Sequence, residues 1–266
     1  MEYFWIFPLL GIAAGVLAGL LGIGGGLVLV ASLVWLLPLF NIPPEAAMHT
    51  ALASSLASIV VTTASSAYAH HRRGSVLWPT VAWMVPGLLL GGWLGSDLAV
   101  YLDGNVLRWL MAIYCLVAAV QIGFGRTRAP ADGSAVAPPV GLPLTAAGTG
   151  IGAMSALVGI GGGSMTVPLL VWRGVVPVRA VGTSSACGVA IGLASAAGYA
   201  LHAPQGALPE YAIGYVYLPA AIGVAAASML SAPLGTWIAH RISGMALRRV
   251  FAFFMVLVGL SVALSG

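Results

Sequence analysis

The sequence predicts an all-α integral membrane protein with two inverted repeats, each made of a glycine-broken helical hairpin and three transmembrane helices. Three observations lead to this fold class. Of the 266 residues, 60% are hydrophobic and only 6% are charged, which is a balance that soluble domains do not show. The apolar stretches are continuous, as in membrane helices, and do not alternate as in barrel strands. Four short motifs recur in the same order in both halves.

The repeated motifs align a first membrane repeat, residues 1–124, with a second, residues 141–266. The paired motifs are GIGGG at 22–26 and at 159–163, HTALASS from His49 and GTSSACG from Gly182, HHRRG from His70 and HAPQG from His202, and GNVLRW from Gly104 and GMALRR from Gly244. Between the halves, residues 125–140 are rich in Pro, Gly, Ser and charge. This composition predicts a polar cytoplasmic linker between two membrane units.

The elements of the first half follow from its apolar runs. We expect a helix through 4–20, a turn at GIGGG and a returning helix through 27–40, because glycine tolerates the positive φ of a tight turn. Full membrane helices are expected to follow, since about 20 helical residues span a hydrocarbon core of about 30 Å. Their predicted ranges are 47–70, 76–101 and 105–124.

The second half repeats this order of elements. Helices at 141–158 and 164–173 are expected around the second GIGGG motif. Three full membrane helices are predicted after them, at 180–201, 211–240 and 245–265.

Arginines predict opposite orientations for the two halves, because short cytoplasmic loops collect basic residues. The first half has Arg72 and Arg73 in the loop whose counterpart, 202–210, has no arginine. In the second half, arginines instead flank the other loops, at Arg173, Arg179, Arg241, Arg248 and Arg249. Inverted repeats each cross the membrane an odd number of times, so three full helices leave each broken segment as a hairpin without a net crossing. One kinked crossing per half, with parallel repeats, is the alternative.

The composition also excludes several functions. The basic residues are all arginine, so the chain lacks the lysine of a P-loop and of a pyridoxal enzyme. Cys115 and Cys187 lie in different apolar runs and are expected to be buried hydrophobic residues. We therefore expect no enzyme activity, no cofactor, no metal site and no nucleic-acid partner.

The glycine breaks are the predicted functional site. Irregular backbone inside a membrane occurs where protein or water satisfies it, and the helix after each break offers free N–H groups and a positive dipole end to an anion. Candidate substrate-binding residues are Gly24, Gly25, Gly26, Gly161, Gly162, Gly163, Ser164, Thr50, Thr183 and Ser184. The alternative is structural: the glycines only permit close packing, as expected for GLLLGGWLG from Gly87 to Gly95, and the hydroxyls bind backbone.

Two histidines related by the duplication, His70 and His202, are candidates for gating or proton coupling. The alternative role for both is anchoring at the membrane interface. Asp97 closes an apolar run and is expected to reach the surface, to pair with an arginine or to relay a proton.

Two GIGGG motifs in a short duplicated membrane protein, the second continuing as GIGGGSMTVP to Pro168, and GTSS at 182–185 resemble the sulfite exporter TauE/SafE family. The resemblance covers essentially the whole chain. It implies a secondary transporter in the bacterial inner membrane that exports a small anion, sulfite or an organosulfonate, by alternating access. Ala31 replaces the counterpart of Pro168, and His49 and Ala51 depart from the family's GTSL, which bears on substrate identity.

Two other functions are alternatives to a carrier. A passive anion channel is the first, and the sequence does not separate it from a carrier. An intramembrane serine hydrolase with Ser164 and His202 as a dyad is the second, and it fits poorly because Leu27 occupies the counterpart of Ser164. The expected partners are a small anion and the lipid bilayer, and no oligomeric state is predicted.

Overall fold

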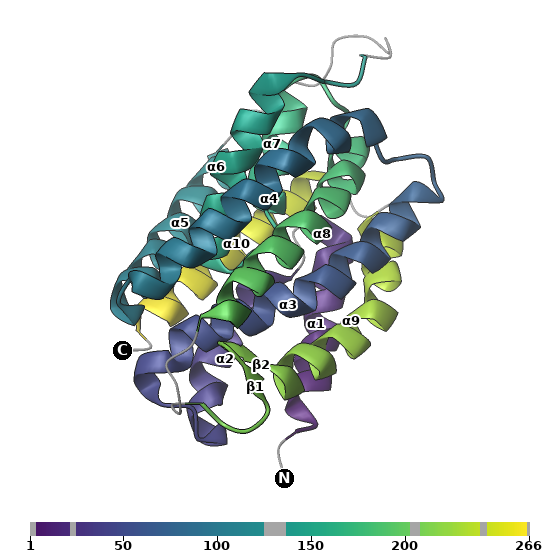
Figure 1. The fold of residues 1–266 in the computed structure, drawn as a ribbon. Helices are drawn as coiled ribbons and strands as arrows, with labels where there is room; N and C mark the ends of the chain where they lie inside the picture. Colours follow the sequence, from purple (N-terminus) through teal and green to yellow (C-terminus); the bar gives the residue numbers. More distant parts are fainter. Residues whose placement is uncertain (1–3, 22–24, 125–136, 203–207, 240–243, 265–266) are drawn as a thin grey trace.

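The computed structural model describes residues 4–21, 25–124, 137–202, 208–239 and 244–264. Within these ranges the chain forms a bundle of helices with one short strand pair (Figure 1). The elements are α1 (Ile6–Leu21), α2 (Gly26–Leu36), the 3₁₀ helix η1 (Leu37–Phe40), α3 (Pro44–His71), α4 (Trp78–Tyr101), α5 (Gly104–Phe124), α6 (Leu142–Val158), α7 (Gly163–Trp172), α8 (Pro177–Leu201), β1 (Ala212–Ile213), β2 (Val216–Tyr217), α9 (Leu218–Ala239) and α10 (Gly244–Ala263).

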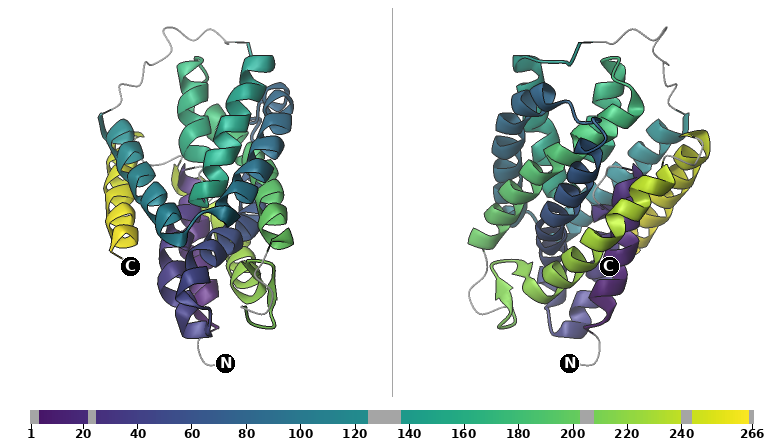
Figure 2. Two further views of the ribbon diagram at one scale, coloured as in Figure 1. Left: turned by 60° about the vertical axis from the view of Figure 1, so that its left-hand side comes forward. Right: turned by 90° about the vertical axis from the view of Figure 1, so that its right-hand side faces the viewer.

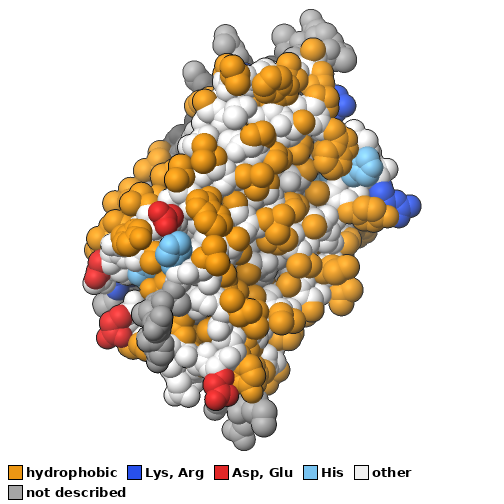
Figure 3. Space-filling model, viewed as in Figure 1, with side chains coloured by type: hydrophobic (Ala, Val, Ile, Leu, Met, Phe, Trp, Pro, Cys, Tyr) orange, Lys and Arg blue, Asp and Glu red, His pale blue; other side chains and the backbone are white. Residues whose placement is uncertain are grey.

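The predicted all-α membrane fold is confirmed. Among the described residues, 5 helices are long and apolar enough to cross a membrane: α3, α4, residues 104–121 of α5, α8, and residues 218–235 of α9. Their outer faces are apolar, and Figure 3 shows hydrophobic side chains spread over the visible surface with few charged ones. Such a surface suits hydrocarbon, which offers no partner to polar groups.

One predicted helix is wrong at its start. Residues from 211 were expected to be helical, but β1 and β2 form an antiparallel hairpin in which Ala212 pairs with Tyr217. The reversal occurs at Gly214, which has φ of 56°, a value that favours glycine. Helix α9 therefore begins only at Leu218.

The first glycine break separates two helices that return to the same end of the bundle. The ring of Phe40, at the end of η1, lies 4.9 Å from the ring of Phe7 and 5.6 Å from that of Phe4. The segment from 4 to 40 therefore ends where it begins, which agrees with a hairpin and not with a kinked crossing. Figure 2 shows α1 and α2 towards the end that carries the N-terminus, and α6 and α7 towards the opposite end.

The two halves are joined by close helix pairs. Helix α1 lies along α9, α6 lies along α4, and α3 and α8 pack together between these pairs. Glycines permit the approach: a Cβ added at Gly87, Gly91 or Gly95 of α4 would lie 1.9 to 2.5 Å from carbonyl oxygens of α6. Membrane helices use small residues in this way, so the packing role expected for the GLLLGGWLG segment is confirmed. Helices α5 and α10 pair with each other at one side (Figure 2).

Candidate functional site

The glycine breaks of the two halves lie against each other. A Cβ added at Gly26 would lie 2.5 Å from the carbonyl oxygen of Gly159 and 3.1 Å from the Cα of Ile160. Ser55 of α3 bridges the two breaks, because its Oγ lies 3.3 Å from the oxygen of Gly26 and 3.0 Å from that of Gly159. The two GIGGG segments, far apart in the sequence, are thus in contact in the interior of the bundle.

A helix begins directly after each break, and the glycine before each helix has the same backbone conformation in both halves. Gly25, before α2, has φ 67° and ψ 2°, and Gly162, before α7, has φ 70° and ψ −2°. Neither helix start has a side-chain cap, so its first N–H groups are available to a ligand. Gly24 lies outside the described residues.

The approach of neighbouring atoms to these glycines is close. A Cβ on Gly25 would lie 2.3 Å from the oxygen of Ala14, and one on Gly162 would lie 2.4 Å from the Cδ1 of Ile191. Gly163 is buried at the first position of α7, and the oxygen of Gly161 would lie 3.2 Å from a Cβ on Gly188 of α8. Residues other than glycine therefore do not fit at Gly25 or Gly162 without displacing these neighbours.

The predicted hydroxyl groups divide into two kinds. Thr50 is fully buried, and its Oγ1 has no hydrogen-bond partner among the described residues. Thr183, its counterpart, donates to the oxygen of Arg179 (2.7 Å) and accepts from the N–H of Leu77 (3.0 Å). The Thr183 hydroxyl is thus engaged by backbone groups, which favours the structural role. Ser184, beside it, is buried.

Ser164 is the second residue of α7, and its hydroxyl is hydrogen-bonded to that of Tyr114 on α5. His202 lies elsewhere, with Asp97 and Gly198 as its partners. The serine–histidine dyad considered from the sequence is therefore not assembled.

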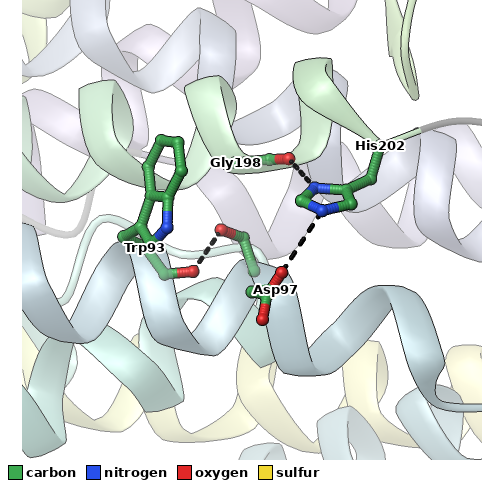
Figure 4. A network of polar contacts seen from close by, with 5 residues as sticks. Trp93, Asp97, Gly198 and His202 are labelled. Carbon is green, nitrogen blue, oxygen red and sulfur yellow. Dashed lines mark hydrogen bonds and ion pairs between the residues drawn. The ribbon is translucent and has the colours of Figure 1, made fainter.

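His202 forms an ion pair with Asp97 on α4 (Figure 4). Its Nδ1 lies 2.8 Å from the carbonyl oxygen of Gly198, and its Nε2 lies 3.3 Å from Oδ1 of Asp97. A carbonyl oxygen only accepts, so Nδ1 carries a proton. The partner of Asp97 is thus a histidine and not the arginine expected as one option.

His70 is in the last turn of α3, where it is buried near the start of α4. Its Cβ would lie 3.1 Å from a Cβ on Gly182, and its carbonyl accepts the N–H of Ser75 in the loop before α4. Asp97 and His202 instead lie near the end of α4. The two predicted histidines therefore occupy opposite ends of the bundle.

The side chain of His49 contacts the end of α4 and the ring of a tyrosine, which indicates a structural role. Its Nε2 lies 3.2 Å from the oxygen of Ala99 and 3.0 Å from that of Leu102, at the end of α4. Its ring stacks on Tyr215 at 5.1 Å. The histidine at position 49 is thus explained by an interaction with the last carbonyl groups of a helix.

Sequence reasoning missed several polar residues around the breaks: Ser55, Tyr114, Ser155 and Thr166. Ser55 lies inside the repeated HTALASS motif, so that motif could have drawn attention to it. Nothing in the local sequence separates the other three from the many hydroxyl groups that only bind their own helix.

A Ser55→Ala variant should weaken the contact between the two glycine breaks. We expect it to lower the free energy of unfolding by about 1 to 2 kcal/mol, because two buried carbonyl groups lose a donor. Ser58→Ala is the matched control, since Ser58 is equally buried and, within the described ranges, its hydroxyl bonds the oxygen of Ser55 in its own helix and no group of either break. Thermal unfolding in detergent measures both, and equal losses would contradict a bridging role for Ser55.

Known proteins resemble the chain over nearly all its length. A family model for the sulfite exporter TauE/SafE matches residues 7–262. A probable membrane transporter protein of Haemophilus influenzae is 34% identical over 257 residues, which cover 96% of each chain. One from Xylella fastidiosa is 27% identical over 252 residues, covering 93% of this chain and 90% of the relative. One from Methanocaldococcus jannaschii is 26% identical over 263 residues, covering 97% and 96%.

No solved structure matches the chain at a significant level. The family match, the relatives named as transporters and the apolar helices establish a multi-pass membrane protein that is not an enzyme. Its relatives in Haemophilus influenzae and Xylella fastidiosa are consistent with a location in the bacterial inner membrane. The chain belongs to the sulfite exporter TauE/SafE family of membrane transporters.

Proposed function

We propose that the protein is a secondary transporter that exports a small anion, sulfite or an organosulfonate, across the inner membrane. The observation that supports this most is the meeting of the two glycine breaks, each at the start of a helix. Helix N-termini present N–H groups and the positive end of the helix dipole, and both stabilise an anion without a buried lysine.

We propose further that residues 1–124 and 141–266 are inverted repeats that move against each other in alternating access, joined by the cytoplasmic linker 125–140. The exchanged pairings of α1 with α9 and of α6 with α4 support this. A similar contact before each partner helix also supports it, although the two hydroxyl groups are not at equivalent positions, since the counterpart of Thr183 is Thr50 and not Ser54. The N–H of Leu77, before α4, donates to Thr183, and that of Tyr217, before α9, donates to Ser54. Transporters with such repeats bind substrate where the repeats meet.

The substrate class is tested by thermal unfolding of the purified protein with sulfite, sulfoacetate, thiosulfate and a neutral control. A ligand that binds only the folded state stabilises it by about 2.7 kcal/mol at 100 times its Kd. We expect a rise in the unfolding temperature with at least one sulfur anion and none with the neutral compound. Absence of a response to every anion would contradict the sulfur-anion assignment.

A passive anion channel is the alternative mechanism. Proteoliposomes preloaded with unlabelled anion separate the two, because a carrier exchanges it for labelled anion outside and accumulates label transiently. We expect saturable counterflow of this kind. Uptake that rises linearly with concentration and shows no counterflow would indicate the channel.

We propose that His202 couples transport to protons, with His70 as a gate at the opposite end. The geometry of the Asp97 pair supports this role. With Nδ1 donating to Gly198, a hydrogen bond between Nε2 and Oδ1 requires one further proton. The pair is also partly exposed, 32% for His202 and 43% for Asp97, and it lies near the ends of α4 and α8, which supports access for that proton.

An Asp97→Asn variant should keep counterflow but lose uptake driven by an imposed pH gradient. The neutral amide of asparagine does not form an ion pair with a protonated His202, as the carboxylate of Asp97 does. Asp103→Asn is the matched control: this carboxylate is exposed and accepts the N–H of Asn105. Uptake into proteoliposomes at a series of pH gradients measures both variants. An unchanged gradient dependence in Asp97→Asn would refute proton coupling through this pair.

A further inference from the structure

The two glycine breaks differ in the polarity of the side chains around them. Around the second break lie the hydroxyl groups of Ser155, Ser164 and Thr166. Aligning the two GIGGG motifs places apolar residues at the corresponding positions of the first break, namely Ala18, Leu27 and Leu29. The repeats are therefore unequal at the place where they meet.

Two of these hydroxyl groups are buried without a partner. Ser155 and Thr166 are each 0% exposed, and neither oxygen has a hydrogen-bond partner in the ranges that the structure describes. A buried polar group without a partner destabilises the folded protein, and nearly all buried polar groups in proteins are satisfied. Two such groups beside one turn indicate a place where a ligand completes the hydrogen bonds.

Both residues are next to the start of α7. The Oγ of Ser155 would lie 3.1 Å from a Cβ on Gly162, so the hydroxyl lies against the glycine that begins the helix. Thr166 is in the first turn of α7, and its N–H donates to the oxygen of Gly162 at 2.8 Å. Within the described backbone, the N–H groups of residues 161–164 donate to no carbonyl group.

We propose that the anion binds at only one of the two glycine breaks, the second, with Ser155 and Thr166 as its side-chain hydrogen-bond donors. This inference rests on the proposed anion transport. Each oxygen of a sulfite or sulfonate group is an acceptor, so the group matches two hydroxyl donors and the N–H groups at the start of α7. The first break contributes backbone contact and apolar walls, and Tyr114 positions Ser164 through their mutual hydrogen bond.

The variants Ser155→Ala and Thr166→Val test this inference, because each removes a hydroxyl at nearly constant volume. We expect each to weaken sulfite binding by about tenfold or more, the loss typical of a hydrogen bond to a charged group. The unfolding temperature without ligand should stay the same or rise, since no partner is lost in the empty protein. Thr166→Ser, which keeps the hydroxyl, should bind sulfite like the wild type.

Ser195→Ala is the matched control. Ser195 is fully buried on α8, and its hydroxyl donates to the oxygen of Gly92 at 3.3 Å. This variant should unfold at a lower temperature without ligand and bind sulfite with unchanged affinity. Calorimetric titration with sodium sulfite and thermal unfolding in the same detergent give both quantities.

The outcomes separate the inference from the function on which it rests. Wild-type affinity in both Ser155→Ala and Thr166→Val, while the wild type binds sulfite, would overturn only the one-sided site. A lower unfolding temperature without ligand, together with unchanged affinity, would show that the hydroxyls are structural and would also overturn it. Failure of the wild type to bind sulfite or sulfoacetate would overturn the proposed function and this inference together.

Discussion

A Gly25→Ala variant should have a free energy of unfolding roughly 2 to 5 kcal/mol lower than the wild type and should lose transport activity. The loss of stability combines the strain of a left-handed backbone conformation with the overpacking caused by the added methyl group. Gly25 has φ of 67°, where an L side chain costs roughly 1 to 2 kcal/mol. The added Cβ would also lie 2.3 Å from the oxygen and 2.8 Å from the Cα of Ala14. These are backbone atoms of α1, so the collision displaces a helix and not a flexible side chain.

Gly74→Ala isolates the conformational part of this effect. Gly74 has φ of 66°, and an added Cβ would meet nothing within 4 Å. We expect this variant to lose only about 1 kcal/mol and to keep transport. Unfolding in detergent and counterflow of labelled sulfite measure both variants. Equal losses at Gly25 and Gly74 would show that close packing at the break has no effect of its own.

The second large effect is expected for Gly91→Ala, with a loss of roughly 3 kcal/mol from overpacking. A Cβ at Gly91 would lie 2.0 Å from the carbonyl oxygen of Thr149 and 2.7 Å from its carbonyl carbon. Helices α4 and α6 must therefore separate. Because α6 leads directly into the second glycine break, we also expect sulfite transport to fall sharply.

Gly150→Ala on the facing helix should have the opposite sign. A Cβ at Gly150 would meet nothing within 4 Å, and alanine in a helix is favoured over glycine by about 1 kcal/mol. This variant should be as stable as the wild type or up to about 1 kcal/mol more stable. Thermal unfolding of the two variants side by side is the measurement. A neutral Gly91→Ala would contradict the close contact between α4 and α6.

Much of the fold could be predicted from local sequence. The breaks at GIGGG, the helices around them and the long apolar helices all agree with the structure within a few residues, because hydrophobic length and glycine conformation act over short distances. The start of α9 could not be predicted in this way. Residues 211–217 are apolar enough for a membrane helix, and the contact of Tyr217 with Ser54 on α3 favours the hairpin.

By itself, the sequence determined that the chain is a membrane protein of helices, that four short motifs of its first half recur in order in its second, and where glycines interrupt each half. The tertiary structure decided which polar groups meet. Ser55 reaches Gly159 across 104 residues, Asp97 pairs with His202, and Thr183 is engaged by Leu77 while Thr50 stays without a described partner. The reason is physical: helix formation depends on neighbours along the chain, whereas a hydrogen bond between helices depends on which faces packing brings together.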